Sequence, residues 1–96
     1  MLRDWRKKGR IFGIPGLPRV RGYAYPRWQF TETLSPKSWV ARVVEASEKA
    51  RLSPLALHLF MTNPDAGDNR SPLQAAEAGD VDTAVKMVTA ANAQGS

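Results

Sequence analysis

The chain has 96 residues, no cysteine and a formal net charge of +5 at pH 7. This length allows one small domain with a modest core, and the absence of cysteine excludes disulfides, thiolate nucleophiles and zinc–thiolate sites. No apolar run approaches the roughly 20 residues that a membrane-spanning helix needs, and arginines and Gly9 interrupt the N-terminal stretch where a signal peptide would be apolar. We therefore expect a cytoplasmic protein with no membrane association.

The positive charge is concentrated at one end of the chain. Residues 1–27 carry eight basic side chains and one acidic side chain, a net charge of +7, whereas residues 28–96 carry six basic and eight acidic side chains, a net charge of −2. Such asymmetry is typical of an arm that contacts nucleic acid or an acidic protein face, and a merely solvated arm explains it equally well. The candidate nucleic-acid-binding residues are Arg3, Arg6, Lys7, Lys8, Arg10, Arg19, Arg21 and Arg27.

The first 18 residues predict a short helix followed by an extended segment. Residues 2–9 suit one or two helical turns that end at Gly9. Residues 11–18 contain too many glycines and prolines for a helix. Their apolar side chains are too numerous for a simple linker, so we expect this segment to lie against the rest of the fold.

Alternating aromatic residues between Val20 and Thr31 predict one or two short strands, which Pro26 restricts to an edge or a bend. We expect Trp28 and Phe30 to be core residues. Tyr23 and Tyr25 stay open between a core role and base stacking, because aromatic faces next to cations also bind single-stranded nucleic acid.

Beyond residue 34 the pattern becomes helical. Ser-Pro pairs at 35–36, 53–54 and 71–72 each precede an apolar-periodic stretch. The predicted helices cover residues 36–51, 54–61, 72–78 and 81–92. The helix at 54–61 is apolar almost all round, which favours a central or interfacial position. The alanine-rich third and fourth helices permit close approach of another helix or another chain.

Strong local signals separate the last three helices. Pro64 disfavours a helical conformation at the residue before it and so ends one helix. Ser71 caps the next helix, with Gln74 three residues later as a capping box requires. Gly79 closes that helix in a left-handed conformation, and Asp80 caps the helix that follows.

These elements define a mainly α fold class. We expect a small bundle of about four short helices after an extended aromatic and basic segment, whose aromatic spacing also allows a short β-hairpin. In domain terms, residues 1–24 form a basic N-terminal arm and residues 25–96 form the helical domain.

No combination of residues predicts catalysis. The single histidine, His58, lies in an apolar helix without a nucleophile or carboxylate at a suggestive spacing, so a packing histidine is the better interpretation. Asp65 and Asp68 lack the alternating ligand pattern of a calcium loop, and Glu77, twelve residues after Asp65, lies inside the predicted helix at 72–78. We expect no enzyme activity, no metal site and no cofactor.

Three groups of motifs resemble a known family. They are the Tyr-Pro-Arg-Trp-Gln-Phe segment at 25–30, the helix that includes residues 39–44, and a C-terminal series. That series comprises Leu-Phe-Met-Thr-Asn-Pro at 59–64, Arg-Ser-Pro-Leu at 70–73, Gly79-Asp80 and Val85. The pattern is similar to the toxin-binding domain of the Xre/MbcA/ParS antitoxin family.

The resemblance implies a non-enzymatic antitoxin that binds a cognate toxin, typically an NAD-consuming RES-domain enzyme, and neutralises it by occluding its active site. Antitoxins of this family are helical and often dimeric, so a homodimer is expected. The toxin-binding residues that it implies are Asn63, Pro64, Arg70, Ser71, Pro72, Leu73 and Gln94.

Two other hypotheses remain. In one, the chain is a small basic nucleic-acid-binding protein that contacts DNA through the arm. In the other, it is an obligate homodimer whose interface is the apolar helix at 54–61. The nucleic-acid hypothesis is compatible with an antitoxin if the arm autoregulates expression and the bundle inhibits the toxin.

Overall fold

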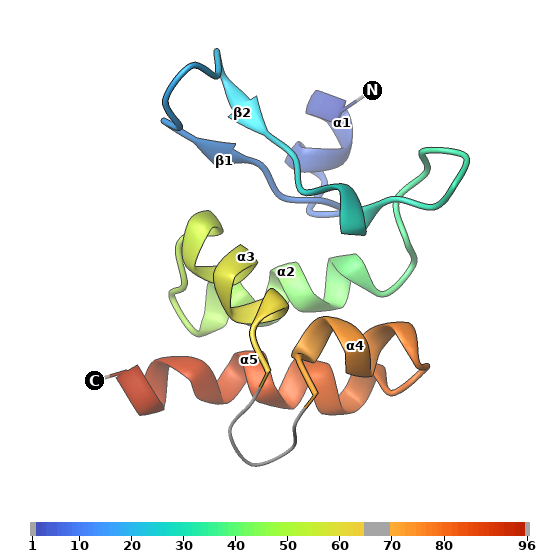
Figure 1. Ribbon diagram of the computed structural model, residues 1–96, viewed down its shortest axis with the longest axis vertical. Coiled ribbons are helices and arrows are strands. Elements are labelled where there is room, and N and C mark those ends of the chain that lie inside the picture. The colour runs from blue at the N-terminus through green and yellow to red at the C-terminus, as the bar shows by residue number, and fades with distance from the viewer. Residues whose placement is uncertain (1, 65–69, 96) are drawn as a thin grey trace.

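The protein is described by a computed structural model that covers residues 2–64 and 70–95, with side chains as far as residue 91. Figure 1 shows three tiers: a hairpin with the first helix, a middle pair of helices, and a final pair. The chain order is α1 (Leu2–Lys7), β1 (Ile14–Pro15), β2 (Tyr23–Ala24), the 3₁₀ helix η1 (Arg27–Gln29), α2 (Val40–Lys49), α3 (Pro54–Thr62), α4 (Pro72–Glu77) and α5 (Val81–Gly95). The expected mainly α class with a small hairpin is confirmed.

The predicted start of the first long helix at Pro36 is wrong, because α2 begins at Val40. Pro36 instead forms an antiparallel bridge with Phe30. The backbone on both sides of this bridge is also paired: the Thr31 N–H donates to Ser35 at 2.8 Å, and the Lys37 N–H donates to Gln29 at 2.8 Å. Residues 35–37 are therefore held extended by backbone pairing with residues 29–31, which overrides the Ser-Pro signal.

The later helix boundaries agree with the sequence signals. Ser53 and Ser71 are the N-caps of α3 and α4, and the capping box of Ser71 with Gln74 is complete. Asn63 ends α3 in an extended conformation before Pro64. Gly79 has a φ of +91°, the left-handed conformation expected after α4.

The main core lies between α2, α3, α5 and the N-terminal segment. Its buried residues are Phe12, Ile14, Val40, Val43, Val44, Ala46, Leu57, Met61 and Val88. A second small cluster of Ala75, Ala76 and Ala84 lies where α4 meets α5. Because these side chains are only methyl groups, the two helix backbones can approach closely, as expected from the alanine-rich sequence.

The extended segment after α1 belongs to the same core as the helices. Ile11, Phe12 and Ile14 are all buried, with 6% or less of their surface exposed. This agrees with the expectation that the segment lies against the rest of the fold. Residues 1–24 thus carry half of the chain's basic side chains and also supply buried side chains that pack on the helices.

The hairpin is short and tightly packed. Ile14 pairs with Ala24 and Pro15 pairs with Tyr23 in antiparallel register. A β-carbon at Gly13 would lie 2.9 Å from the Cβ of Tyr23 and 3.0 Å from Cε1 of Tyr25. Gly13 therefore allows the two tyrosines to cover this backbone.

His58 is a packing residue, as expected. Its Nδ1 accepts a hydrogen bond from Nε1 of Trp28 at 3.1 Å, and the two rings are nearly parallel. The Trp39 ring is also nearly parallel to that of Trp28, and the two ring centroids are 5.9 Å apart. Trp28 and Phe30 are both half-buried, and Trp28 packs against the main core.

Candidate protein-interaction site

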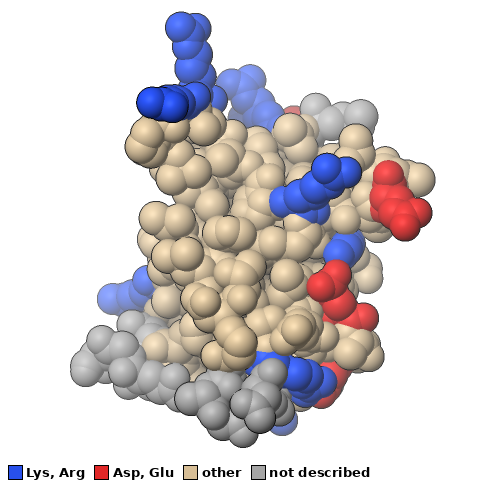
Figure 2. Space-filling view, viewed as in Figure 1, with Lys and Arg blue, Asp and Glu red and all other residues tan. Residues whose placement is uncertain are grey.

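Helix α3 exposes a line of side chains that contains no charge. Leu57 and Met61 are buried in the core, whereas Leu55 and Leu59 are 42% and 51% exposed. Residues four apart lie on the same face of a helix, so Leu55, Leu59 and Asn63 form one stripe. No Lys, Arg, Asp or Glu occurs in α3, and Figure 2 shows a broad uncharged face where Figure 1 places this helix.

The stripe ends at Asn63, whose polar side chain caps the C-terminus of α3. The Nδ2 group of Asn63 donates to the backbone carbonyl of Leu59 at 2.6 Å, which satisfies one of the free carbonyls at the end of the helix. Pro64 follows and is exposed. We refer to Leu55, Leu59, Asn63 and Pro64 as the α3 stripe.

The other residues of the expected toxin-binding set have structural roles at the start of α4. The Ser71 hydroxyl accepts from the Gln74 N–H at 3.1 Å, and the Ser71 N–H donates to Oε1 of Gln74 at 2.9 Å. Pro72 is buried, and Leu73 packs against the main core. Gln94 lies in α5, but its side chain is outside the described residues. Of the described members, Asn63 and Pro64 are exposed, Arg70 and Leu73 are half-buried, and Ser71 and Pro72 are buried.

An ion pair joins the start of α4 to the start of α5. Arg70 donates to Oδ2 of Asp80 at 3.1 Å, and the Thr83 hydroxyl donates to Oδ1 of Asp80 at 2.7 Å. The hydrogen bond from the Thr83 side chain, followed by that from Arg70, lowers the pKa of Asp80 below its ordinary value of 3.8. The Thr83 backbone also hydrogen-bonds to the Asp80 carboxylate, so Asp80 caps α5, as the sequence predicts, and also pairs with Arg70.

The lowered pKa of Asp80 predicts a specific pH dependence. A depressed folded-state pKa adds stability above the unfolded value of 3.8, and this stability disappears as the pH falls through the folded value. We therefore expect Asp80→Asn to lower the melting temperature at neutral pH, with the difference shrinking as the pH falls below 3.8. Thermal unfolding across this pH range measures it.

Glu32→Gln is the matched control, because Glu32 is exposed in a turn and no described cation forms an ion pair with it. Its melting temperature should stay close to that of the native chain across the range. A pH-independent deficit for Asp80→Asn would show that the carboxylate charge contributes nothing to stability.

The eight basic arm residues gather around the hairpin and α1, and Figure 2 shows Lys and Arg side chains at that end of the molecule. Seven of them are exposed and Arg6 is half-buried. The Arg6 guanidinium lies over the Tyr23 ring, 4.0 Å from its centroid, and Tyr23 is 40% exposed. Within residues 2–64 and 70–91, none of the eight forms an ion pair.

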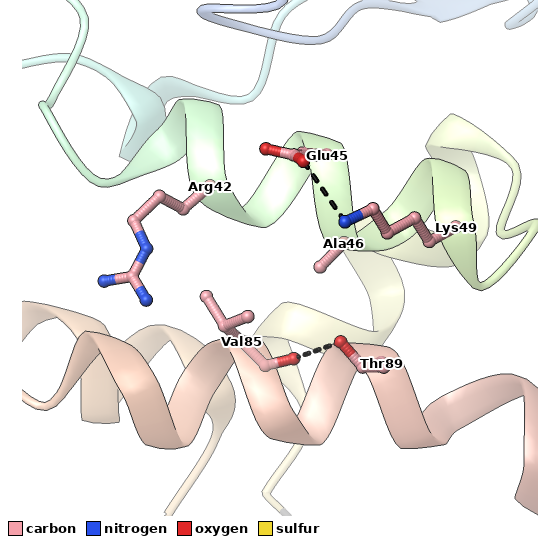
Figure 3. Close-up of a pocket in the computed structure, with 6 residues that line it drawn as sticks. All are labelled: Arg42, Glu45, Ala46, Lys49, Val85 and Thr89. Carbon is pink, nitrogen blue, oxygen red and sulfur yellow. Dashed lines mark hydrogen bonds and ion pairs between the residues drawn. The ribbon is translucent and has the colours of Figure 1, made fainter.

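A pocket of about 160 Å³ lies between α2 and α5 (Figure 3). Its floor is apolar, from Ala46 and Val85, and its charged rim is internally paired. Lys49 lies 3.2 Å from the Glu45 carboxylate, and Arg42 pairs with Asp82. The first pair lies within α2 and the second joins α2 to α5, so the charged side chains at the rim are already paired.

The exposure of Leu55 and Leu59 was not predicted from the sequence. An all-round apolar helix does not reveal which of its leucines face the core. The available signal was the four-residue spacing that aligns both with Asn63, a polar helix end.

In the part of the chain that the structure describes, no cluster of three or more His, Asp or Glu side chains could hold a metal ion. No helix there has both the length and the apolar character that crossing a membrane requires. Comparisons with family models, with curated proteins and with solved structures find no match to this chain.

Proposed function

We propose that this protein is a non-enzymatic, antitoxin-like subunit that binds a cognate toxin of the RES type and neutralises it by occluding the active site. The observation that supports this most directly is the α3 stripe, where two exposed leucines lead to the Asn63-Pro64 motif. Large apolar side chains in a line on a rigid helix are a common basis of helix-mediated protein recognition.

The hydrogen bonds at the start of α4 support the same proposal. The Ser71–Gln74 capping box and the Arg70–Asp80 ion pair hold the start of α4. Preorganised surfaces lose less conformational entropy on binding than flexible ones. In this proposal the buried Ser71 and Pro72 position the start of α4, and the exposed Asn63 and Pro64 contact the toxin.

Co-expression with the product of an adjacent toxin-like gene tests the proposal. We expect a complex that survives affinity purification and restores growth to cells that express the toxin. Absence of both a complex and growth rescue would remove the hypothesis. Sedimentation of the chain alone at micromolar concentration checks the accompanying expectation of a homodimer.

Nucleic-acid binding is a second candidate function, favoured by the unpaired arm cations and the exposed Tyr23 beside Arg6. Each neutralised phosphate releases counterions, so affinity for a single-stranded oligonucleotide should fall steeply between about 50 and 200 mM salt. The triple change Arg19→Gln, Arg21→Gln and Arg27→Gln should reduce the salt slope by roughly 2, because each contact to a single strand contributes about 0.7. Fluorescence anisotropy measures both.

The matched control for that experiment neutralises two cations outside the arm, Lys37→Gln and Lys49→Gln. Both residues are already in ion pairs, with Glu77 and Glu45. Their replacement should leave the slope unchanged. Binding that ignores salt, or that is lost only when the C-terminal helices are altered, would exclude the arm as the binding surface.

A further inference from the structure

Arg6 of α1 is held over an exposed tyrosine of the hairpin, at the end of the molecule where Figure 1 places α1 beside β1 and β2. Its guanidinium carbon lies 4.0 Å from the centroid of the Tyr23 ring, and Tyr23 is 40% exposed. The Tyr23 side chain packs closely on the backbone of Gly13, where an added β-carbon would lie 2.9 Å from the Cβ of Tyr23. We refer to these two side chains as the Arg6–Tyr23 pair.

The fold leaves the hydrogen-bond donors of Arg6 unused. Its Nε is buried and has no hydrogen-bond partner. Within residues 2–64 and 70–91 its two Nη atoms form no hydrogen bond or ion pair either, and both reach the solvent. A buried donor without a partner costs free energy that an apolar side chain at the same position would avoid. Contact with Tyr23 therefore explains where the guanidinium lies, but the Nη donors remain available to a ligand.

No described acidic group compensates the charge of Arg6. Residues 1–34 contain eight basic side chains and two acidic ones, Asp4 and Glu32. Asp4 is two positions from Arg6 on α1, and residues two apart do not face each other on a helix. In the described part of the chain, neither acidic side chain is ion-paired with any of the eight cations. The surface around the pair therefore suits a ligand with several negative charges.

Tyr23 is more accessible than the neighbouring Tyr25. The two ring centroids are 6.4 Å apart and the rings are tilted by 37°, so they do not stack on each other. Tyr25 is half-buried and belongs to an apolar groove, which it lines with Leu2, Trp5, Phe30 and Leu34. Of the two tyrosines, Tyr23 is therefore the one that a ligand reaches more readily.

The chemistry of the pair favours single-stranded nucleic acid. A guanidinium binds a phosphate through two parallel N–H groups, and both aromatic rings and arginine side chains stack on bases that are not in a duplex. The carboxylates of an acidic protein segment would use Arg6 only. We propose that the Arg6–Tyr23 pair binds one nucleotide of a single strand, with a phosphate on Arg6 and the base against the exposed surface of the pair. This inference rests on the second candidate function, nucleic-acid binding, and names its substrate class.

Fluorescence anisotropy with two labelled probes tests the inference on the full 96-residue chain. One probe is a thymine oligonucleotide of about 12 nucleotides, and the other is the duplex of this strand with its adenine complement. Phosphate charge alone favours the duplex, because its charge density is higher. We expect the single strand to bind at least about fivefold more tightly, because only its bases are free to stack.

Two substitutions assign the contacts. Tyr23→Leu removes the ring and should weaken single-strand binding at least about fivefold, with duplex affinity unchanged. Arg6→Met removes the guanidinium and should also reduce the salt slope for the single strand by about 0.7, the contribution of one phosphate contact. The melting temperature of Arg6→Met should stay unchanged or rise, because the buried unpartnered Nε is removed.

Two further variants are the matched controls. Tyr23→Phe keeps the aromatic ring and should bind both probes as the native chain does. Arg51→Met removes an exposed arginine outside the arm, one that forms no ion pair with any described residue. It should leave both the affinity and the salt slope unchanged.

The inference and the function on which it rests can fail separately. Salt-dependent single-strand binding that persists in both Tyr23→Leu and Arg6→Met would overturn the role of the pair and retain the arm as the binding surface. Duplex binding as tight as single-strand binding would overturn base stacking. No binding of either probe would overturn both proposals. If a labelled polyglutamate peptide binds and loses affinity on Arg6→Met while neither oligonucleotide binds, the pair receives carboxylates and the proposed ligand is wrong.

Discussion

Gln29→Ala should lower the free energy of unfolding by about 2–5 kcal/mol, because it removes the partner of two buried backbone groups. Gln29 is fully buried, and its Oε1 accepts from the Phe12 N–H at 2.7 Å while its Nε2 donates to the Phe12 carbonyl at 2.9 Å. Strand β1 begins only at Ile14, so neither group of Phe12 has a place in the β-ladder. The Gln29 side chain acts as the missing strand partner.

The expected loss is a large share of the stability of so small a domain, and it corresponds to a fall in melting temperature of at least about 10 °C. Urea unfolding followed by circular dichroism measures the free energy directly. Gln74→Ala is the matched control: Gln74 is exposed, its side chain accepts one hydrogen bond in the capping box, and its removal should cost about 1 kcal/mol. A Gln29 variant as stable as the control would show that Phe12 finds other partners.

Leu59→Glu should abolish toxin neutralisation if the α3 stripe is the binding surface. Truncating or charging a central interface residue costs about 2 kcal/mol or more, which is roughly a 30-fold loss of affinity. Burying a carboxylate without a partner adds to that cost. Growth rescue by co-expression and the Kd for the purified toxin measure the effect.

The same variant should fold normally. Glu has nearly the same helix propensity as Leu, and Leu59 is already 51% exposed, so the melting temperature should stay within a few degrees. Leu34→Glu is the control, because it places the same charge at an exposed leucine far along the chain from α3. Full neutralisation by Leu59→Glu would contradict the assignment. Conversion of a dimer to a monomer by Leu59→Glu would assign the stripe to self-association instead.

Helix ends were predictable where the signal is local. Ser53 and Ser71 cap their helices and Gly79 ends α4, because a cap depends on residues within one turn. Pro36 has the same dipeptide signal and begins no helix. Its segment pairs with the backbone at Phe30, a contact that depends on the turn at residues 31–35 and not on the Ser-Pro pair.

The candidate surfaces were less predictable than the helices. Of the residues implied by the family resemblance, the buried Ser71 and Pro72 build the start of α4, and Asn63 is exposed. Residue type alone does not separate these roles, because good helix caps and good contact residues are often the same polar residues. The exposure of Leu59 likewise required the orientation of α3 on the core.

The sequence by itself determined that this chain forms several short capped helices and divides its charge between a basic N-terminal segment and an acidic remainder. Both properties depend on residue type and near spacing. Only the tertiary structure decided that Gln29 pairs with Phe12 across 17 residues and that Leu34 lines an apolar groove. Those outcomes depend on which distant segments meet, because a side chain is buried or exposed only by its neighbours in space.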